Sequence, residues 1–193
     1  MNVLIIPEDF RKDQYVLKPL IEAMMASAGK PRANVRVCQE PLMGDVHQAL
    51  KWERIQQVLD RYRGMVDLYL LLVDRDGETH RRERIDKIEA KAAEALPPSR
   101  MLLGENAWQE VEVWVLAGHD LPSKWSWTEL RAHPHPKENY FEPFSRLRGL
   151  AEAPEGGRQV LAKAAAARYE RVRQLCPEDV GTLEKRIRDF IAR

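Results

Sequence analysis

The chain has 193 residues, of which 44% are hydrophobic and 32% are charged, and its formal net charge is +1. This length supports one domain with its own core, and the composition excludes a disordered or membrane-embedded chain. The charge balance excludes a strongly basic DNA-coating protein. It does not exclude a nuclease, because the charges of acidic metal ligands and of basic phosphate contacts cancel in the net charge. Two cysteines, Cys38 and Cys176, are too few for a disulfide framework or a four-cysteine zinc site.

The first part of the chain alternates apolar runs with helical patterns. Residues 3–6 form a continuous apolar run that predicts a strand buried on both faces. The apolar spacing over 17–28 predicts a helix that ends near Gly29, and 35–38 predicts a short strand near the sheet edge. Asp45 is placed to cap the next helix, over 46–62.

Residues 66–73 are the most hydrophobic segment, and we predict that they form the central strand. A helix over 85–96 and a short strand over 101–104 follow. Residues 110–117 are ambiguous, because their alternation allows a strand while their Ala and Leu content allows a helix. Strands that alternate with helices at this spacing predict an α/β fold with a mostly parallel sheet flanked by helices.

The composition divides the chain into three expected parts. Residues 1–118 form the α/β core, 119–156 an irregular insert rich in Trp, His and Pro, and 157–193 a helical C-terminal extension that packs on the core. No apolar stretch approaches the ~20 residues needed to span a membrane. The N-terminus lacks a signal-peptide pattern, so we expect a cytoplasmic protein.

The clearest chemical signal is the position of acidic residues at the ends of predicted strands. In a parallel α/β sheet, ligands bind at the carboxyl ends of the strands. Carboxylates gathered there favour a hard cation such as Mg²⁺ or Mn²⁺, although Asp-x-Asp-Gly is also an ordinary turn. These acidic residues are Glu8 after the first strand, Asp74 and Asp76 after the central strand, and Glu105, Glu110 and Glu112 after the fourth.

The order of these motifs resembles the Toprim pattern, which has a Glu after the first strand and an Asp-x-Asp after a hydrophobic third strand. Topoisomerases, primases, recombination proteins and the overcoming-lysogenization-defect (OLD) nucleases share it. More narrowly, the chain is similar to small stand-alone Toprim-like proteins of a domain-of-unknown-function family found beside ATPases in bacterial genomes. Residues 110–116, with sequence EVEVWVL, and Cys176-Pro177-Glu178 carry this narrower resemblance.

The resemblance covers most of 1–118 and parts of 157–193. It implies a Toprim-like, Rossmann-like fold and a divalent-metal-dependent cleavage or transfer at a nucleic-acid phosphodiester. It implies Glu8 as general acid/base or metal ligand and Asp74 and Asp76 as metal ligands, with Glu112 and Glu110 as accessory acids. It also associates the chain with phage defence and with a partner protein such as an ATPase.

Basic and aromatic residues near these acids allow more than one interpretation. Arg75 lies between the two Asp residues and is the best single candidate for a substrate-phosphate contact. The basic residues over 81–91 form either a phosphate-binding face or a solvated helix face with internal ion pairs, and we favour the second. Trp125 and Trp127 are suited to stack on bases, but anchoring of the insert on the core is preferred.

The leading functional hypothesis is a Mg²⁺- or Mn²⁺-dependent nuclease that acts on DNA or RNA. The alternative is a non-catalytic subunit that serves as scaffold or regulator of a partner ATPase. The loop after Glu8, which has no Gly where the family usually has one, and the Trp-rich insert motivate this alternative. A phosphotransferase or phosphatase with a phosphorylated Asp74 is a third, weaker option. The near balance of charge predicts weak binding of nucleic acid by this chain alone, and the sequence is compatible with a homo-oligomer.

Overall fold

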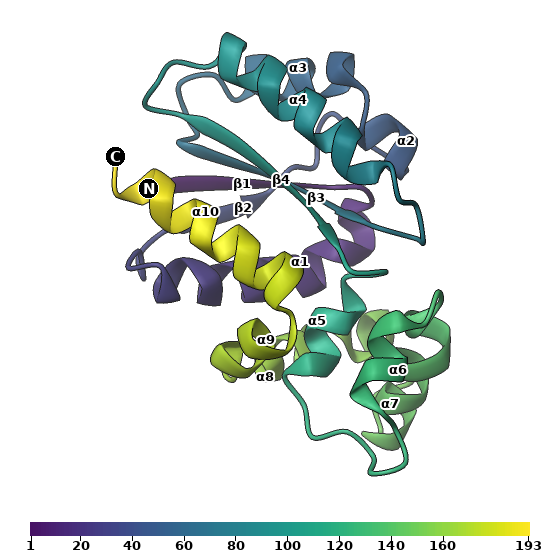
Figure 1. Ribbon diagram of the computed structural model, residues 1–193. Helices are drawn as coiled ribbons and strands as arrows, with labels where there is room; N and C mark the ends of the chain where they lie inside the picture. Colours follow the sequence, from purple (N-terminus) through teal and green to yellow (C-terminus); the bar gives the residue numbers. More distant parts are fainter.

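The computed structural model describes residues 1–193, and its four-stranded sheet has helices on both faces (Figure 1). All neighbouring strands are parallel, in the order β2-β1-β3-β4. The predicted α/β fold with a mostly parallel sheet is therefore confirmed, and the arrangement is Rossmann-like. The strands are β1 (Asn2–Pro7), β2 (Asn34–Val37), β3 (Leu68–Asp74) and β4 (Met101–Ala107).

Both faces of the sheet are buried, which explains why its inner strands read as continuous apolar runs. Along β1, Val3 and Ile5 belong to the larger of two hydrophobic cores, whereas Leu4 and Ile6 belong to the smaller one. Successive side chains of a strand point to opposite faces, so an unbroken apolar run fills both cores at once.

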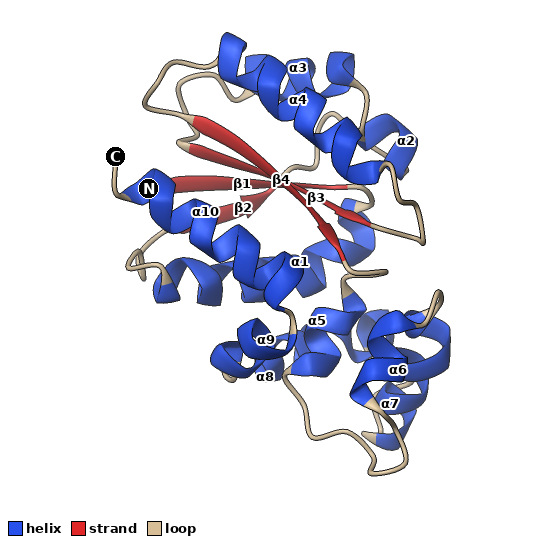
Figure 2. Ribbon diagram, in the orientation of Figure 1, coloured by secondary structure: helices blue, strands red, loops and turns tan.

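Helices cover both faces of the sheet, and a further group of helices lies beyond one of these layers (Figure 2). The smaller core lies under α2 (Val46–Ala49), α3 (Trp52–Arg61) and α4 (Arg81–Ala95). The larger core is closed by α1 (Phe10–Ser27) and by helices from the second half of the chain. These are α5 (Glu112–Ala117), α8 (Arg158–Ala166), α9 (Tyr169–Leu175) and α10 (Thr182–Ile191). None of the helices combines the length and apolar character needed to cross a bilayer.

Several element boundaries differ from the predicted ones. The helix expected over 46–62 is two helices, α2 and α3, and the ambiguous segment 110–117 is helical, as α5. The fourth strand extends to Ala107, so Glu105 lies within β4 and not after it. The polar Glu105 and Asn106 end the apolar run, yet their backbone continues to pair with Leu72 and Val73 of β3.

The insert over 119–156 is not irregular throughout, which corrects the prediction. It contains α6 (Trp127–Ala132), a π-helical segment η1 (Lys137–Phe141), α7 (Glu142–Leu147) and the start of the 3₁₀ segment η2 (Pro154–Gly157). Its prolines suggested a loop, but Pro143 lies in the first turn of α7. The turn before it is already helical, because the N–H of Glu142 donates to the carbonyl of Lys137, so the chain carries Pro143 within a continuous helical segment.

Candidate functional site

The site is built at the point where the chain reverses its direction across the sheet. From β1 the chain continues to β2 on one side, whereas β3 and β4 lie on the other side. In open α/β sheets this switch point, at the carboxyl ends of the strands, is where ligands bind. Glu8 follows β1 and Asp74 ends β3, so one acid lies on each side of the switch point.

Glu8 and Asp74 are in direct contact. The Glu8 carboxylate accepts a hydrogen bond from the backbone N–H of Asp74, with 3.3 Å between Oε2 and N. The Asp74 carboxylate in turn accepts one from the backbone N–H of Val111, at 2.9 Å. The start of α5 therefore holds Asp74 in place, and both acids are half-buried.

The chain turns sharply after Asp74, as the predicted Asp-x-Asp-Gly turn requires. Asp76 and Gly77 have φ angles of +48° and +73°, a left-handed conformation that glycine adopts at little cost. The Asp76 carboxylate lies 2.9 Å from Nη1 of the buried Arg81, which also donates to the carbonyl of Asp74. Asp76 therefore holds its own turn together through Arg81.

Glu112 and Glu110, the predicted accessory acids, connect the core to later segments. Glu112 is 4% exposed and forms an ion pair with Arg158 of α8, which is 6% exposed. Glu110 accepts a hydrogen bond from the backbone N–H of Lys137, at 2.8 Å, and so holds the start of η1.

Asp13 is a further acid of this site that the sequence analysis missed. It lies in the first turn of α1, and its carboxylate accepts a hydrogen bond from the backbone N–H of Asp9 at 3.1 Å. One signal pointed to it, because Asp13 falls on the same helical stripe as Val16, Leu17 and Leu20, which face the core. An acid on an apolar stripe is expected to be at least half-buried.

Burial and mutual repulsion raise the pKa values of these acids. Burial raises the pKa of Glu8 from 4.5 to about 7, and the charges of Asp76 and Glu112 add to the shift. Burial raises the pKa of Asp13 from 3.8 to about 7, with Glu112 and Glu8 adding to it. The pKa of Asp74 is raised well above its usual 3.8 by burial, then by Glu112 and Glu8. A cation at this edge would relieve that repulsion.

The donor atoms suit Mg²⁺ or Mn²⁺, because these ions take oxygen ligands and Mg²⁺ commonly uses one or two carboxylates plus water or phosphate oxygens. Glu8 and Asp74 supply such a pair. No three acidic, histidine or cysteine side chains are grouped so that they could hold one ion. Of the three predicted ligands, the structure brings Glu8 and Asp74 together, while Asp76 contacts Arg81.

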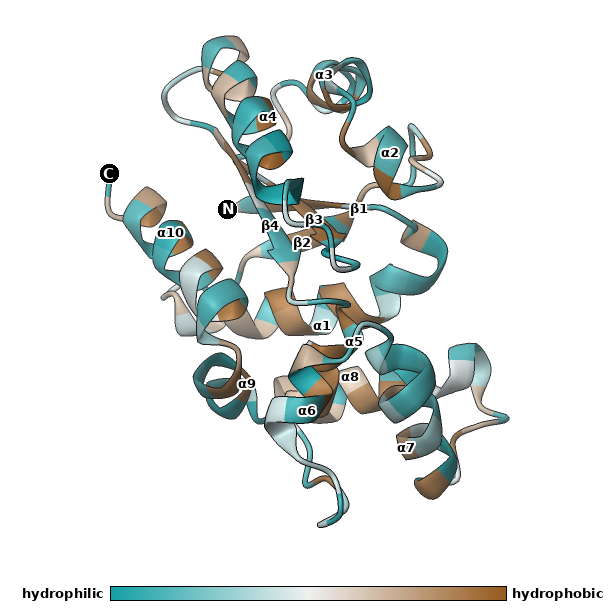
Figure 3. Cartoon of the chain, turned by 45° about the vertical axis from the view of Figure 1, so that its right-hand side comes forward, coloured by the Kyte–Doolittle hydropathy of each residue, from teal (hydrophilic) through white to brown (hydrophobic).

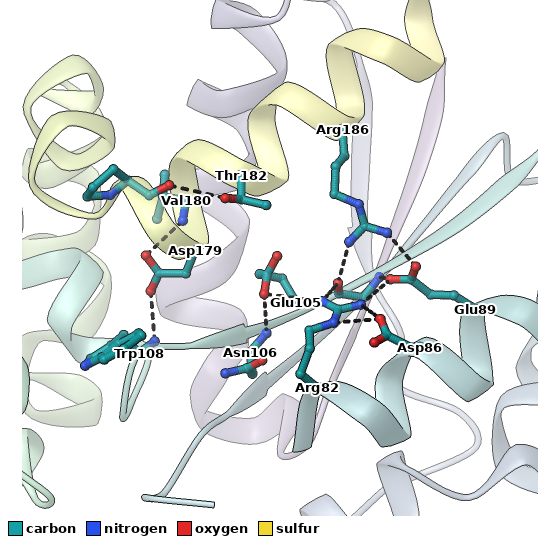
Figure 4. Close-up of polar contacts among 12 residues, drawn as sticks. Arg82, Asp86, Glu89, Glu105, Asn106, Trp108, Asp179, Val180, Thr182 and Arg186 are labelled. Atoms are coloured by element: carbon teal, nitrogen blue, oxygen red, sulfur yellow. Dashed lines mark hydrogen bonds and ion pairs between the residues drawn. The ribbon is translucent and has the colours of Figure 1, made fainter. Parts of the chain in front are cut away.

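Arg75, the predicted phosphate contact, lines a cavity to which neither Glu8 nor Asp74 contributes. Its guanidinium carbon lies 4.2 Å from the centre of the Trp108 ring. Together with Arg82, Glu105 and Asp179 it lines a cavity of about 240 Å³. Figure 4 shows the polar contacts around this cavity, including those of Arg82 with Glu105 and of Asp179 with Trp108.

The tryptophans mainly anchor the fold, which confirms the preferred interpretation. Trp125 and Trp127 are partly buried and pack against the larger core. Trp114 is buried within that core and donates its Nε1–H to Asp179 at 2.7 Å.

Comparison of the chain with known protein families, with curated proteins and with solved structures finds no match. The resemblance to Toprim-like proteins therefore stays a prediction.

Proposed function

We propose that the protein is a Mg²⁺- or Mn²⁺-dependent nuclease of Toprim-like type that cleaves phosphodiesters of DNA or RNA. The observation that carries the proposal is the contact of Glu8 with Asp74 at the switch point of the sheet, among acids whose charges repel one another. Such a half-buried acidic edge favours a hard cation, and a cation held there would offer its remaining coordination positions to phosphate oxygens of a substrate.

In this proposal, Asp74 and Glu8 provide oxygen ligands, and Asp76 maintains the turn through Arg81. A bound divalent ion supplies Lewis-acid polarisation of a phosphoryl oxygen and lowers the pKa of its water. Glu8 is proposed as the general acid/base or as a ligand of the ion, because its carboxylate contacts the backbone of Asp74 at this edge. Glu112 and Glu110 support the site. Arg75 lies beside Trp108 at the adjoining cavity, so it is proposed to hold a neighbouring phosphate of the substrate and not the one that is cleaved.

The test compares cleavage of plasmid, single-stranded DNA and RNA by the wild type, Glu8→Gln and Asp74→Asn in Mg²⁺ or Mn²⁺. We expect each substitution to slow cleavage by about 10²-fold or more. Glu78→Gln is the matched control, because Glu78 is an exposed acid in the same loop. Equal cleavage rates of the wild type and Asp74→Asn would contradict the proposal.

The second candidate is a non-catalytic subunit that acts as scaffold or regulator of a partner ATPase. What favours it is the engagement of the acids by the protein itself, because Asp76 pairs with Arg81 and Glu112 with Arg158. Titration calorimetry with Mn²⁺ separates the two candidates. Absence of Mn²⁺ binding together with co-elution with an ATPase encoded beside it supports the scaffold, and Mn²⁺ binding that Asp74→Asn abolishes supports the nuclease.

A further inference from the structure

Helix α4 carries its charges on two different faces. On one face, Arg82 forms ion pairs with Asp86, at 2.7 Å, and Glu89, at 3.0 Å, and also contacts Glu105 of β4 (Figure 4). Arg186 of α10 also pairs with Glu89. On this face the expected network of ion pairs is confirmed, and its cations are neutralised.

The other face of α4 carries cations without acidic partners. Arg84, Lys87 and Lys91 recur at i, i+3 and i+7, so they form one stripe along the helix. All three are exposed, and none takes part in an ion pair. Helix α4 is largely hydrophilic along its length, as the teal colour in Figure 3 shows. Unlike the Arg82 face, this stripe is free to bind an external anion.

The stripe borders a groove between α3 and α4. The groove has a volume of about 330 Å³, and Lys51 and Trp52 line its α3 side. The Lys91 ammonium lies 5.8 Å from the centre of the Trp52 ring. The charged residues that line the groove are four cations and one acid, Glu53, which leaves an excess of three positive charges; the cations are Lys51, Arg84, Lys87 and Lys91. The whole chain has a net charge of only +1.

We propose that this groove binds the phosphate backbone of a single-stranded segment of nucleic acid and places a base against Trp52. Cations beside an aromatic ring are the combination with which proteins hold single strands, because phosphates pair with the cations and bases stack on the ring. This inference rests on the proposed nuclease function and names the surface that holds its substrate.

The position of the stripe connects it to the acidic site. Helix α4 begins at Arg81, which contacts both Asp74 and Asp76. Lys91 is ten residues further on, which corresponds to ~15 Å along a helix. A strand bound in the groove therefore extends from the acidic edge along the outer surface of α4. An acidic peptide meets the same charges but has no base to place on Trp52.

The test measures binding of a fluorescently labelled, unstructured oligonucleotide by anisotropy in EDTA, over a series of salt concentrations. The probe variant is Arg84→Gln, Lys87→Gln, Lys91→Gln. The control variant is Lys30→Gln, Arg32→Gln, Arg36→Gln, which removes the same charge from exposed cations that have no ion pairs and lie around β2. Thermal melting of all three proteins checks that they are folded.

We expect the probe variant to bind the oligonucleotide about tenfold or more weakly. The slope of the logarithm of its binding constant against the logarithm of the salt concentration should decrease in magnitude by about 2, because each lost phosphate contact to a single strand contributes ~0.7. The control variant keeps the wild-type slope. Trp52→Ala weakens binding by about tenfold, whereas Trp52→Phe retains most of it. Equal effects of the probe and control variants would overturn the proposal.

Polyglutamate of the same length serves as the competing probe. If it binds the groove as tightly as the oligonucleotide does, the groove is a surface for an acidic protein and the inference is wrong. Because binding is measured in EDTA, its outcome is independent of cleavage. If binding depends on the stripe but no metal-dependent cleavage is found, the nuclease proposal is wrong and the groove inference stands. If cleavage is metal-dependent but the probe variant binds the oligonucleotide as tightly as the wild type, the groove inference is wrong and the nuclease proposal stands.

Discussion

Glu112 and Arg158 form a buried ion pair that joins the first turn of α5 to the first residue of α8. Arg158 also lies over the ring of Phe141, with 5.3 Å between its guanidinium carbon and the ring centre. The pair therefore fixes an acid beside Asp74 to two segments that follow much later in the chain. Because removing both charges from water costs free energy, the pair adds little net stability, and its main effect is to hold Glu112 in position.

Arg158→Met is expected to lower the free energy of unfolding by about 3–5 kcal/mol at pH 8, because it leaves Glu112 as a buried carboxylate without a partner. Urea denaturation measures the change. The double variant Arg158→Met, Glu112→Gln should recover a large part of the loss. Arg168→Met, which breaks an exposed pair with Asp120, is the control and should change stability little. Wild-type stability of Arg158→Met would contradict this account.

Gly118→Ala is expected to destabilise the contact between α5 and α8 by about 1–3 kcal/mol. A Cβ atom at Gly118 would lie 2.4 Å from the Cα atom of Ala165, too close for the backbones to keep their positions. Gly181→Ala is the matched control, because a Cβ there would have 3.8 Å to its nearest neighbour. Thermal melting of both variants checks the prediction, and equal melting temperatures would refute the steric argument.

The strands and their carboxyl edge could be predicted because both faces of the sheet are buried. That burial makes β1 and β3 unbroken apolar runs, and the order of strands and acids along the chain then places Glu8 and Asp74 at one edge. The end of β4 could not be predicted in the same way. Its pairing with β3 continues through backbone hydrogen bonds, although Glu105 and Asn106 are polar.

The partners of the acids could not be predicted, because they are chosen by tertiary packing. Arg158 is 46 residues away from Glu112, and nothing in the local pattern of either residue indicates the other. Asp76 and Arg81 are close in sequence, yet only the sharp turn at Asp76 directs the two side chains toward each other. The same packing decides which cations of α4 are neutralised and which remain free.

Asp179→Asn is expected to lower the free energy of unfolding by about 2–5 kcal/mol. The buried carboxylate accepts hydrogen bonds from the backbone N–H of Trp108 at 2.8 Å and from Nε1 of Trp114 at 2.7 Å, and it pairs with Arg131 at 3.1 Å. An amide cannot accept all of these bonds, and it leaves Arg131 with less compensation. Urea denaturation followed by tryptophan fluorescence measures the loss. Asp189→Asn, at an exposed position of α10, should be neutral.

The stability of the metal-free protein is expected to fall as the pH rises from 5 to 8. The pKa values of Glu8, Asp13 and Glu110 are about 7 in the folded protein, against usual values of 4.5, 3.8 and 4.5. Between those values and 7 the folded state binds more protons than the unfolded state, so each rise in pH favours unfolding. The contribution of these acids is complete below about pH 4 and is lost as the pH passes through 7.

Thermal melting in EDTA at intervals between pH 5 and 8 measures this dependence. Asp13→Asn should flatten the profile and raise the melting temperature at pH 8, because it removes one of the repelling charges without a large change in volume. Addition of Mn²⁺ at pH 8 should raise the melting temperature of the wild type and have little effect on Asp74→Asn. A melting temperature that is constant or increases from pH 5 to 8 would show that these half-buried carboxylates do not repel one another in the folded protein.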